Sequence, residues 1–303
     1  MNTDVRIWLW SVHREAKATL AALPAVFAEI EAELSRFRPD SALSRLNSAA
    51  GRGPQRVSGM LAEVIGQALQ AAASTGGLFD PTVLPALLAA GYGTSFGTIA
   101  AQGGFGVAVP PVAALGPRWS EVGVEGLAVS LPAGSALDLG GIAKGWTADR
   151  IATLLRAFGP ALVDAGGDVR ASGAAGGRPW PVTIGDPRQS GAVLAEVELD
   201  DEAVVTSSIV RRRWQSGGQN QHHLIDPRTQ RPAATDLLSV SVVGPAAAAA
   251  EVHAKVALIL GSAAGVRYLE ARGLSGLFVE ASGSVVAVGD RLAAAAGRPG
   301  ASR

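Results

Sequence analysis

The chain has 303 residues, no cysteine, and as many acidic as basic residues, so its formal net charge is zero. This length allows one or two domains with a large core, and the zero net charge argues against a nucleic-acid or anionic-membrane surface. Without cysteine there are no disulfides, thiolate metal sites or cysteine nucleophiles. No apolar run approaches the ~20 residues of a membrane span, so we expect no transmembrane segment.

Apolar spacing predicts more strands than helices, in an irregular order that favours the α+β class. Pro39 ends the first helix, and Asp40 or Ser41 can cap a short helix after it. The predicted elements, in chain order, are a strand at 5–9, helices at 14–37 and 58–73, an apolar segment at 83–88, an irregular connection at 91–118, a hairpin at 122–137, a helix at 151–158, a buried strand at 161–170, strands at 180–184, 193–199, 203–206 and 238–243, a helix at 246–260 and a hairpin at 277–288.

The segment 138–149 has the pattern of a strand, a glycine turn and a helix. Its sequence is DLGGIAKGWTAD, with Asp138 before the glycines and Lys144 after them. Glycines allow close approach of backbone N–H groups to a ligand, and the start of a helix favours anions. The alternative is an ordinary helix start that Asp138 helps to cap.

Lysine and histidine are scarce, so their positions carry information. Lysine occurs only at Lys17, Lys144 and Lys255, among 26 cationic residues. Of the four histidines, His222 and His223 stand directly before an Asp-Pro-Arg-Thr sequence. Taken alone, this pair is more typical of a loop histidine bonded to the backbone than of a catalytic group.

Six segments in order resemble the ApbE family of FAD:protein FMN transferases, over the chain from Met1 to about Val288. They are PDSALSRLN at 39–47, GLFDPT at 77–82, DLGGIAKGWTAD at 138–149, GGD at 166–168, TSS at 206–208 and HLIDPRT at 223–229.

The resemblance implies a fold and a reaction. The fold is a single compact α+β unit like the T-fold, with mixed sheets and flanking helices, over 1–290. The reaction transfers FMN from FAD to a threonine of an acceptor flavoprotein and releases AMP, with magnesium as the usual metal ion. The alternatives are a non-catalytic FAD-binding protein with a degenerate metal site and an FAD pyrophosphatase that produces FMN and AMP.

The resemblance also assigns roles to single residues. His223 matches a histidine implicated in activity, and Asp138 is expected to serve both catalysis and FAD binding. An imidazole titrates near neutral pH and can take a hydroxyl proton. The expected FAD contacts are Met1, Phe37, Leu78, Phe79, Asp80, Asp138, Lys144 and Ile225.

The metal site departs from the family pattern. The family uses an aspartate, a threonine four residues later, and a backbone oxygen that here matches Gly141. The first two positions hold Glu251 and Lys255. An ammonium has no lone pair for magnesium, which needs oxygen ligands. One alternative is an ordinary helix pair between Glu251 and Lys255, and the other is that the Lys255 ammonium replaces the ion.

Other departures concern the termini and one turn. Gln230 replaces the glycine that usually follows Asp-Pro-Arg-Thr. We expect a disordered tail at 291–303. The first residues lack a signal-peptide pattern and a lipid-carrying cysteine, so we expect a cytoplasmic chain, with an exported mature form as the alternative.

Overall fold

The computed structural model describes residues 4–107 and 116–292. The chain divides into two compact units that alternate along the sequence. The first unit takes in Leu23–Ala143 and Arg211–Ala233, and the second takes in the remaining described residues. Each unit is described by itself.

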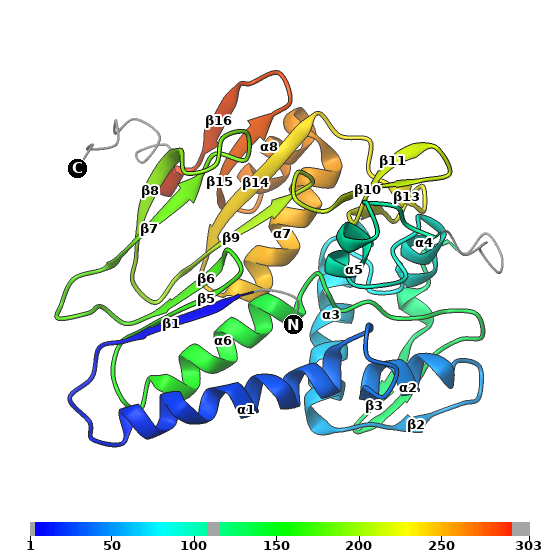
Figure 1. Ribbon diagram of the computed structural model, residues 1–303, viewed down its shortest axis with the longest axis horizontal. Helices are drawn as coiled ribbons and strands as arrows, with labels where there is room; N and C mark the ends of the chain where they lie inside the picture. Colours follow the sequence, from blue (N-terminus) through cyan, green and yellow to red (C-terminus); the bar gives the residue numbers. More distant parts are fainter. Residues whose placement is uncertain (1–3, 108–115, 293–303) are drawn as a thin grey trace. The chain divides into compact units, whose positions relative to one another are not determined.

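The second unit is built on a seven-stranded sheet in the order β1-β5-β6-β9-β14-β15-β16 (Figure 1). Every neighbouring pair of strands in this sheet is antiparallel. We expected mixed sheets, with both parallel and antiparallel pairs, and this sheet is not mixed. Strand β1 lies at one edge of this sheet. The strands are β1 Val5–Leu9, β5 Ala161–Ala165, β6 Asp168–Ser172, β9 Ala203–Ser208, β14 Leu237–Gly244, β15 Ser275–Glu280 and β16 Val285–Val288.

The single strand predicted at 161–170 is wrong, because the structure forms the hairpin β5–β6 there. Gly166 and Gly167 have φ angles of 74° and 96° and make the turn, a conformation that glycine adopts without a steric penalty. Asp164 Oδ1 accepts a hydrogen bond from the Gly167 N–H at 2.7 Å. The turn places Asp168 at the start of β6 with its side chain buried.

Both faces of this sheet are covered. The antiparallel hairpin of β7 (Trp180–Gly185) and β8 (Val193–Leu199) packs its apolar side chains on one face. Helix α7 (Ala247–Leu260) packs against β9 and β14, and α8 (Ser262–Glu270) packs against α7 and β15. Because side chains alternate along a strand, β14 contributes Val243 to the hairpin side and Val242 to the opposite side.

Helix α6 (Ala143–Leu155) approaches α7 at a glycine. A Cβ atom added at Gly145 would lie 2.5 Å from the backbone carbonyl of Ala247 and 2.6 Å from the Ala248 nitrogen. One turn later, the two Asp149 carboxylate oxygens accept the N–H groups of Ala247 and Ala248, both at 2.9 Å. Asp149 therefore caps α7, whose own N-cap residue offers no side-chain hydrogen bond.

The first unit holds short helices and small two- and three-stranded sheets. Helix α1 (Ala16–Leu34) begins in the second unit and continues into the first. The remaining elements of this unit are α2 Ala42–Ser48, β2 Gln55–Arg56, α3 Gly59–Ser74, α4 Leu84–Ala89, α5 Phe96–Ala101, η1 Trp119–Glu121, β3 Gly123–Glu125, β4 Ala128–Ser130, β10 Arg213–Ser216, β11 Gln219–His222, β12 Ile225–Asp226 and β13 Arg231–Pro232.

Local signals in this unit were partly recognised from the sequence. The Ser41 hydroxyl accepts the Ser44 N–H, which confirms its predicted capping role. The connection predicted at 91–118 contains helix α5, which Ser95 caps, and its residues 108–115 lie outside the described part of the chain. The polar segment 213–222 forms the antiparallel hairpin β10–β11.

The α+β class is confirmed by this combination of an antiparallel main sheet and packed helices. Among the described residues, no helix is both long and apolar enough to cross a membrane. Of the predicted tail, Leu292 is fully buried in the core of the second unit, and residues 293–303 lie outside the described part.

The contact at Gly145 gives a stability prediction. Gly145→Ala should lower the free energy of unfolding by about 1–3 kcal/mol, because the facing atoms are backbone and cannot rotate away. The matched control is Gly66→Ala in α3, where an added Cβ meets nothing within 4 Å, and it should raise stability by up to about 1 kcal/mol. Denaturant unfolding measures both, and a Gly145→Ala protein as stable as the wild type would contradict the packing.

Candidate functional site

In the first unit, Asp138 is fixed by an ion pair and two backbone bonds. Its Oδ2 lies 2.6 Å from Arg36 Nε, and both side chains are about nine-tenths buried. Its Oδ1 accepts the Gly140 N–H at 2.5 Å, and its own N–H donates to the Pro81 carbonyl at 2.8 Å. The carboxylate is therefore oriented before any ligand arrives.

Arg36 links Asp138 to a group of aromatic side chains. Its guanidinium lies 4.0 Å from the centre of the Phe37 ring and 4.5 Å from that of Tyr92. The Tyr92 ring stacks on Trp214 at 4.9 Å, and Trp214 donates to a backbone carbonyl at Ala90. Tyr92 and Trp214 are buried, whereas Phe37 is 38% exposed. We call Arg36, Phe37, Tyr92, Trp214 and Asp138 the Asp138 cluster.

Sequence reasoning found Phe37 and Asp138 but missed the other three members. Arg36 Nη1 donates to the Tyr92 carbonyl at 2.8 Å, across a long sequence separation. Its Nη2 is buried and has no hydrogen-bond partner among the described residues. An arginine beside an expected ligand aromatic was the available signal, because arginine commonly stacks on aromatic rings.

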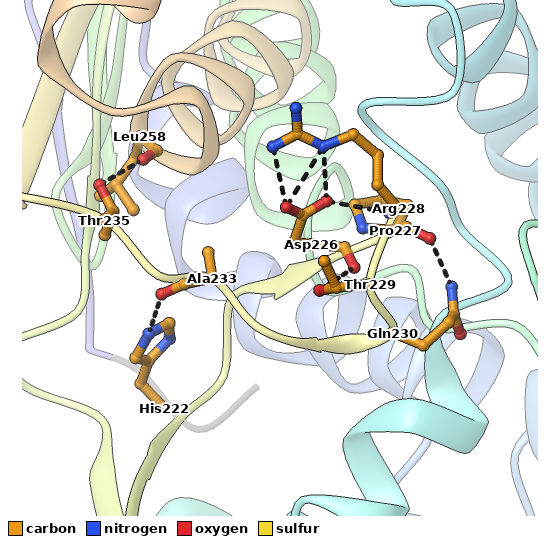
Figure 2. A network of polar contacts seen from close by, with 9 residues as sticks. All are labelled: His222, Asp226, Pro227, Arg228, Thr229, Gln230, Ala233, Thr235 and Leu258. Atoms are coloured by element: carbon orange, nitrogen blue, oxygen red, sulfur yellow. Dashed lines mark hydrogen bonds and ion pairs between the residues drawn. The ribbon is translucent and has the colours of Figure 1, made fainter.

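The two neighbouring histidines differ in environment. His222 Nδ1 accepts the Leu224 N–H at 3.3 Å, so its Nε2 carries the proton and donates to the Ala233 carbonyl at 3.0 Å (Figure 2). Burial lowers the pKa of His222, which favours this neutral form. The ring of His223 instead lies 6.4 Å from that of Tyr92, edge to face. His222 is thus a structural residue, and His223 lies beside the Asp138 cluster.

The turn after His223 is held by Asp226. Its carboxylate accepts the Arg228 N–H and pairs with the Arg228 guanidinium at 2.8 Å (Figure 2). Ile225, the expected FAD contact before it, is 4% exposed. Gln230, where the family has glycine, adopts a φ of 57°, and its side chain donates to the Pro227 carbonyl at 2.9 Å. The turn therefore keeps a glycine-like backbone without the glycine.

The expected FAD contacts at 78–80 lie at a helix end. Phe79 is 3% exposed, and Leu78 is half-buried. Asp80 Oδ1 accepts both the N–H and the hydroxyl of Thr82, at 2.7 and 2.6 Å. Asp80 Oδ2 is buried without a hydrogen-bond partner among the described residues. Burial raises the pKa of this carboxyl.

In the second unit, Lys144 sits between two buried carboxylates. Its Nζ pairs with Asp168 Oδ2 and lies 2.5 Å from Glu251 Oε1. The other oxygen of Glu251 accepts the Gly145 N–H at 2.9 Å. The Asp168 and Glu251 side chains are only 2% and 4% exposed, against 22% for Lys144. We call Lys144, Asp168 and Glu251 the Lys144 cluster.

These contacts decide how the predicted metal ligands fit magnesium. Both Glu251 oxygens are already engaged, by an ammonium and a backbone N–H. Lys255, one turn later on α7 and half-buried, offers no acceptor. Gly141 is buried in the first unit. Within the described residues, no group of three or more His, Cys, Asp or Glu side chains is arranged to hold a metal. The side chains present do not fit the ion.

The sequence predicts that Lys144 contacts FAD, and it predicts no role for Asp168. It therefore does not predict that these two residues form one cluster. The Gly-Gly-Asp segment was the signal, since it marks a tight turn that delivers a carboxylate. Met1, the remaining expected contact, lies outside the described residues.

A family model described as the ApbE family matches residues 1–278. The chain belongs to the ApbE family. It is 36% identical to an FAD:protein FMN transferase of Treponema pallidum, with 86% of this chain and 77% of that protein covered. It is 29% identical to the FAD:protein FMN transferase of Escherichia coli K12, with 82% and 73% covered.

Solved ApbE structures share the fold. The ApbE protein of Thermotoga maritima superposes with a TM-score of 0.77 at 25% identity, covering 94% of both chains. The flavin transferase ApbE of Vibrio cholerae gives 0.75 at 25% identity, covering 95% of this chain and 94% of that one. The ApbE fold expected from the motifs is therefore confirmed.

The backbone at Gln230 can be tested directly. Gln230→Gly should raise the free energy of unfolding by about 0.5–1 kcal/mol, because a left-handed φ is strained in residues with a Cβ. Gln230→Val should lower it, since a β-branched side chain tolerates this φ least. Denaturant unfolding of the pair measures the difference, and equal stabilities would contradict the left-handed conformation.

The buried Asp80 carboxyl predicts a pH effect. Because its pKa in the folded state is raised above 3.8, the folded protein holds this proton more tightly than the unfolded chain. Stability should then fall as pH rises through that raised pKa, and Asp80→Asn should remove this fall and be more stable than the wild type at neutral pH. The exposed Asp40, whose pKa Arg38 lowers, is the control, and Asp40→Asn should not flatten the profile. Parallel pH profiles for wild type and Asp80→Asn would contradict the assignment.

Proposed function

We propose that this chain is an FAD:protein FMN transferase, which moves FMN from FAD to a threonine hydroxyl of an acceptor protein. The observation that carries the proposal is the close match to proteins of that name over about four-fifths of both chains. The Asp138 cluster, His223 and the Lys144 cluster supply chemistry that suits the reaction. FAD is thus the donor substrate, and a flavoprotein is the partner.

The proposed step exchanges the phosphoanhydride bond of FAD for a phosphoester bond to threonine. The threonine oxygen forms a bond to the FMN phosphorus while the bond from that phosphorus to the bridging oxygen breaks. AMP leaves with the bridging oxygen, and the hydroxyl proton passes to a base on the enzyme. Such a step depends on positioning and on charge placed near the phosphoryl oxygens, because little covalent work falls to the protein.

His223 is the proposed base. Its neighbour His222 has both ring nitrogens committed to backbone groups, which makes it unsuitable for proton transfer. An imidazole operates near neutral pH, where it can accept a hydroxyl proton and later release it to water. We assign Asp138 a catalytic role as well, as a carboxylate that its ion pair with Arg36 holds in place.

The remaining expected contacts support FAD binding in different ways. Phe37 presents an exposed ring that suits stacking on a flat ring of FAD. Asp80 offers a free carboxylate oxygen to a hydroxyl or amine donor. Phe79 and Ile225 are so buried that they would act through backbone groups or by packing the loops. The proposed set is Met1, Phe37, Leu78, Phe79, Asp80, Asp138, Lys144 and Ile225.

One observation favours a second candidate, a non-catalytic FAD-binding protein. The position of a metal ligand holds Lys255, and loss of the ion without replacement would remove charge from the reaction. An FAD pyrophosphatase is the third candidate, in which water replaces the threonine. Incubation with FAD and an acceptor carrying a flavinylation motif separates the three. Covalent flavin fluorescence on the acceptor would identify transfer. Free FMN together with AMP would identify hydrolysis, and bound, intact FAD would identify binding alone.

The adjacent histidines provide a matched pair of variants. His223→Gln should reduce the rate of acceptor flavinylation by about 10²-fold or more, through loss of the proton acceptor, with little change in unfolding. His222→Gln should lower stability by about 1–2 kcal/mol, through loss of buried backbone bonds, and keep most of the activity. Fluorescence of the acceptor on a denaturing gel and denaturant unfolding measure these effects. Full activity of His223→Gln would remove it as the base.

A further inference from the structure

Three lysines occur in this chain, and two of them belong to one region of the second unit. Lys144 lies in the Lys144 cluster, and Lys255 follows Glu251 by four residues on α7. Residues four apart in a helix share a face. Lys17, the third, is exposed on α1. The region therefore carries two ammonium groups and the two buried carboxylates of Asp168 and Glu251.

The charges of these four groups cancel. The nearby Asp149 carboxylate is paired with Arg170 at 3.2 Å and bonded to the start of α7, so it adds no free charge. A divalent cation at Glu251 would have to displace the Lys144 ammonium from a carboxylate and would lie one helical turn from Lys255 on α7. Both changes are electrostatically costly in a buried setting.

We infer that this chain transfers FMN without a bound divalent cation, with the Lys255 ammonium taking the place of the ion. Lys255 supplies positive charge to the FAD pyrophosphate. The carboxylate at position 251, which the family uses as a metal ligand, here positions the Lys144 ammonium instead. Ammonium groups are point charges with donor protons, which suit phosphate oxygens. The inference rests on the proposed function and extends it to the source of the charge.

Metal binding is the first readout, because it does not depend on turnover. The 303-residue chain is titrated with Mn²⁺ as a probe for Mg²⁺, and bound ion is measured by electron paramagnetic resonance. We expect no saturable binding in the millimolar range. Lys255→Thr, which restores an oxygen ligand, should instead bind Mn²⁺ saturably in that range. Lys17→Thr is the matched control and should behave as the wild type.

Turnover in a chelator is the second readout. Wild-type flavinylation of the acceptor should be unchanged in EDTA, and Lys255→Thr should lose activity in EDTA and regain it with magnesium. Two results would overturn the inference. One is saturable Mn²⁺ binding by the wild type that is lost in Glu251→Gln, and the other is a wild type that is inactive in EDTA and recovers activity with magnesium.

The two readouts keep this inference apart from the proposed function. If no condition yields flavin on the acceptor, the transferase assignment fails, and the Mn²⁺ titrations still decide whether the ion is excluded. Glu251→Gln removes one of the two ion pairs of Lys144 and leaves the pair with Asp168, so its folding must be checked. A cooperative unfolding transition for each variant confirms that the binding data refer to the folded chain.

Discussion

The ion pairs of Lys144 are the constraint on which the second unit depends. One ammonium joins three elements, because Lys144 lies on α6, Asp168 opens β6 and Glu251 lies on α7. Two carboxylates buried so deeply are tolerable only with a counter-charge, since removing one partner of a buried pair costs about 3–5 kcal/mol. The absence of a side chain at Gly145 and the capping by Asp149 bring α6 close enough to α7 to make the pairing possible.

The segment 138–149, which contains Lys144, has a second constrained charged side chain, Asp138, in the first unit. Asp138 is bound to Arg36, and Arg36 is bound in turn to the Tyr92 carbonyl and stacked on two rings. The passage from one unit to the next falls between Ala143 and Lys144. The segment 138–149 is therefore short and glycine-rich for a physical reason: it must satisfy two independent buried networks within a few residues.

Local patterns in the sequence predicted what depends on local interactions. The helix at 246–260 and the hairpin at 277–288 follow from apolar period and turn residues, and both are present. At Gly166–Gly167 the sequence predicts one strand where the structure has a hairpin, because a strand interruption and a tight turn share the same glycine signal. The partners of Asp138 and Lys144 could not be predicted, since Arg36 and Glu251 are distant in sequence and are brought near only by packing. Family motifs identified which residues matter but not which of them touch.

The scarcity of lysine sharpens the argument about charge. Nearly all cationic residues of this chain are arginine, and Lys144 and Lys255 are two of its three lysines. Arginine at either position would bring a larger, planar group that prefers two parallel bonds to one carboxylate. Lys144 instead bridges two separate carboxylates with a compact tetrahedral donor. The same compactness suits the role that we propose for Lys255, whose ammonium would replace a small ion with half of its charge. With a single positive charge in place of two, the proposed site would hold a diphosphate less strongly than a metal site, and binding would depend on the Lys144 and Lys255 ammonium groups rather than on the supply of magnesium.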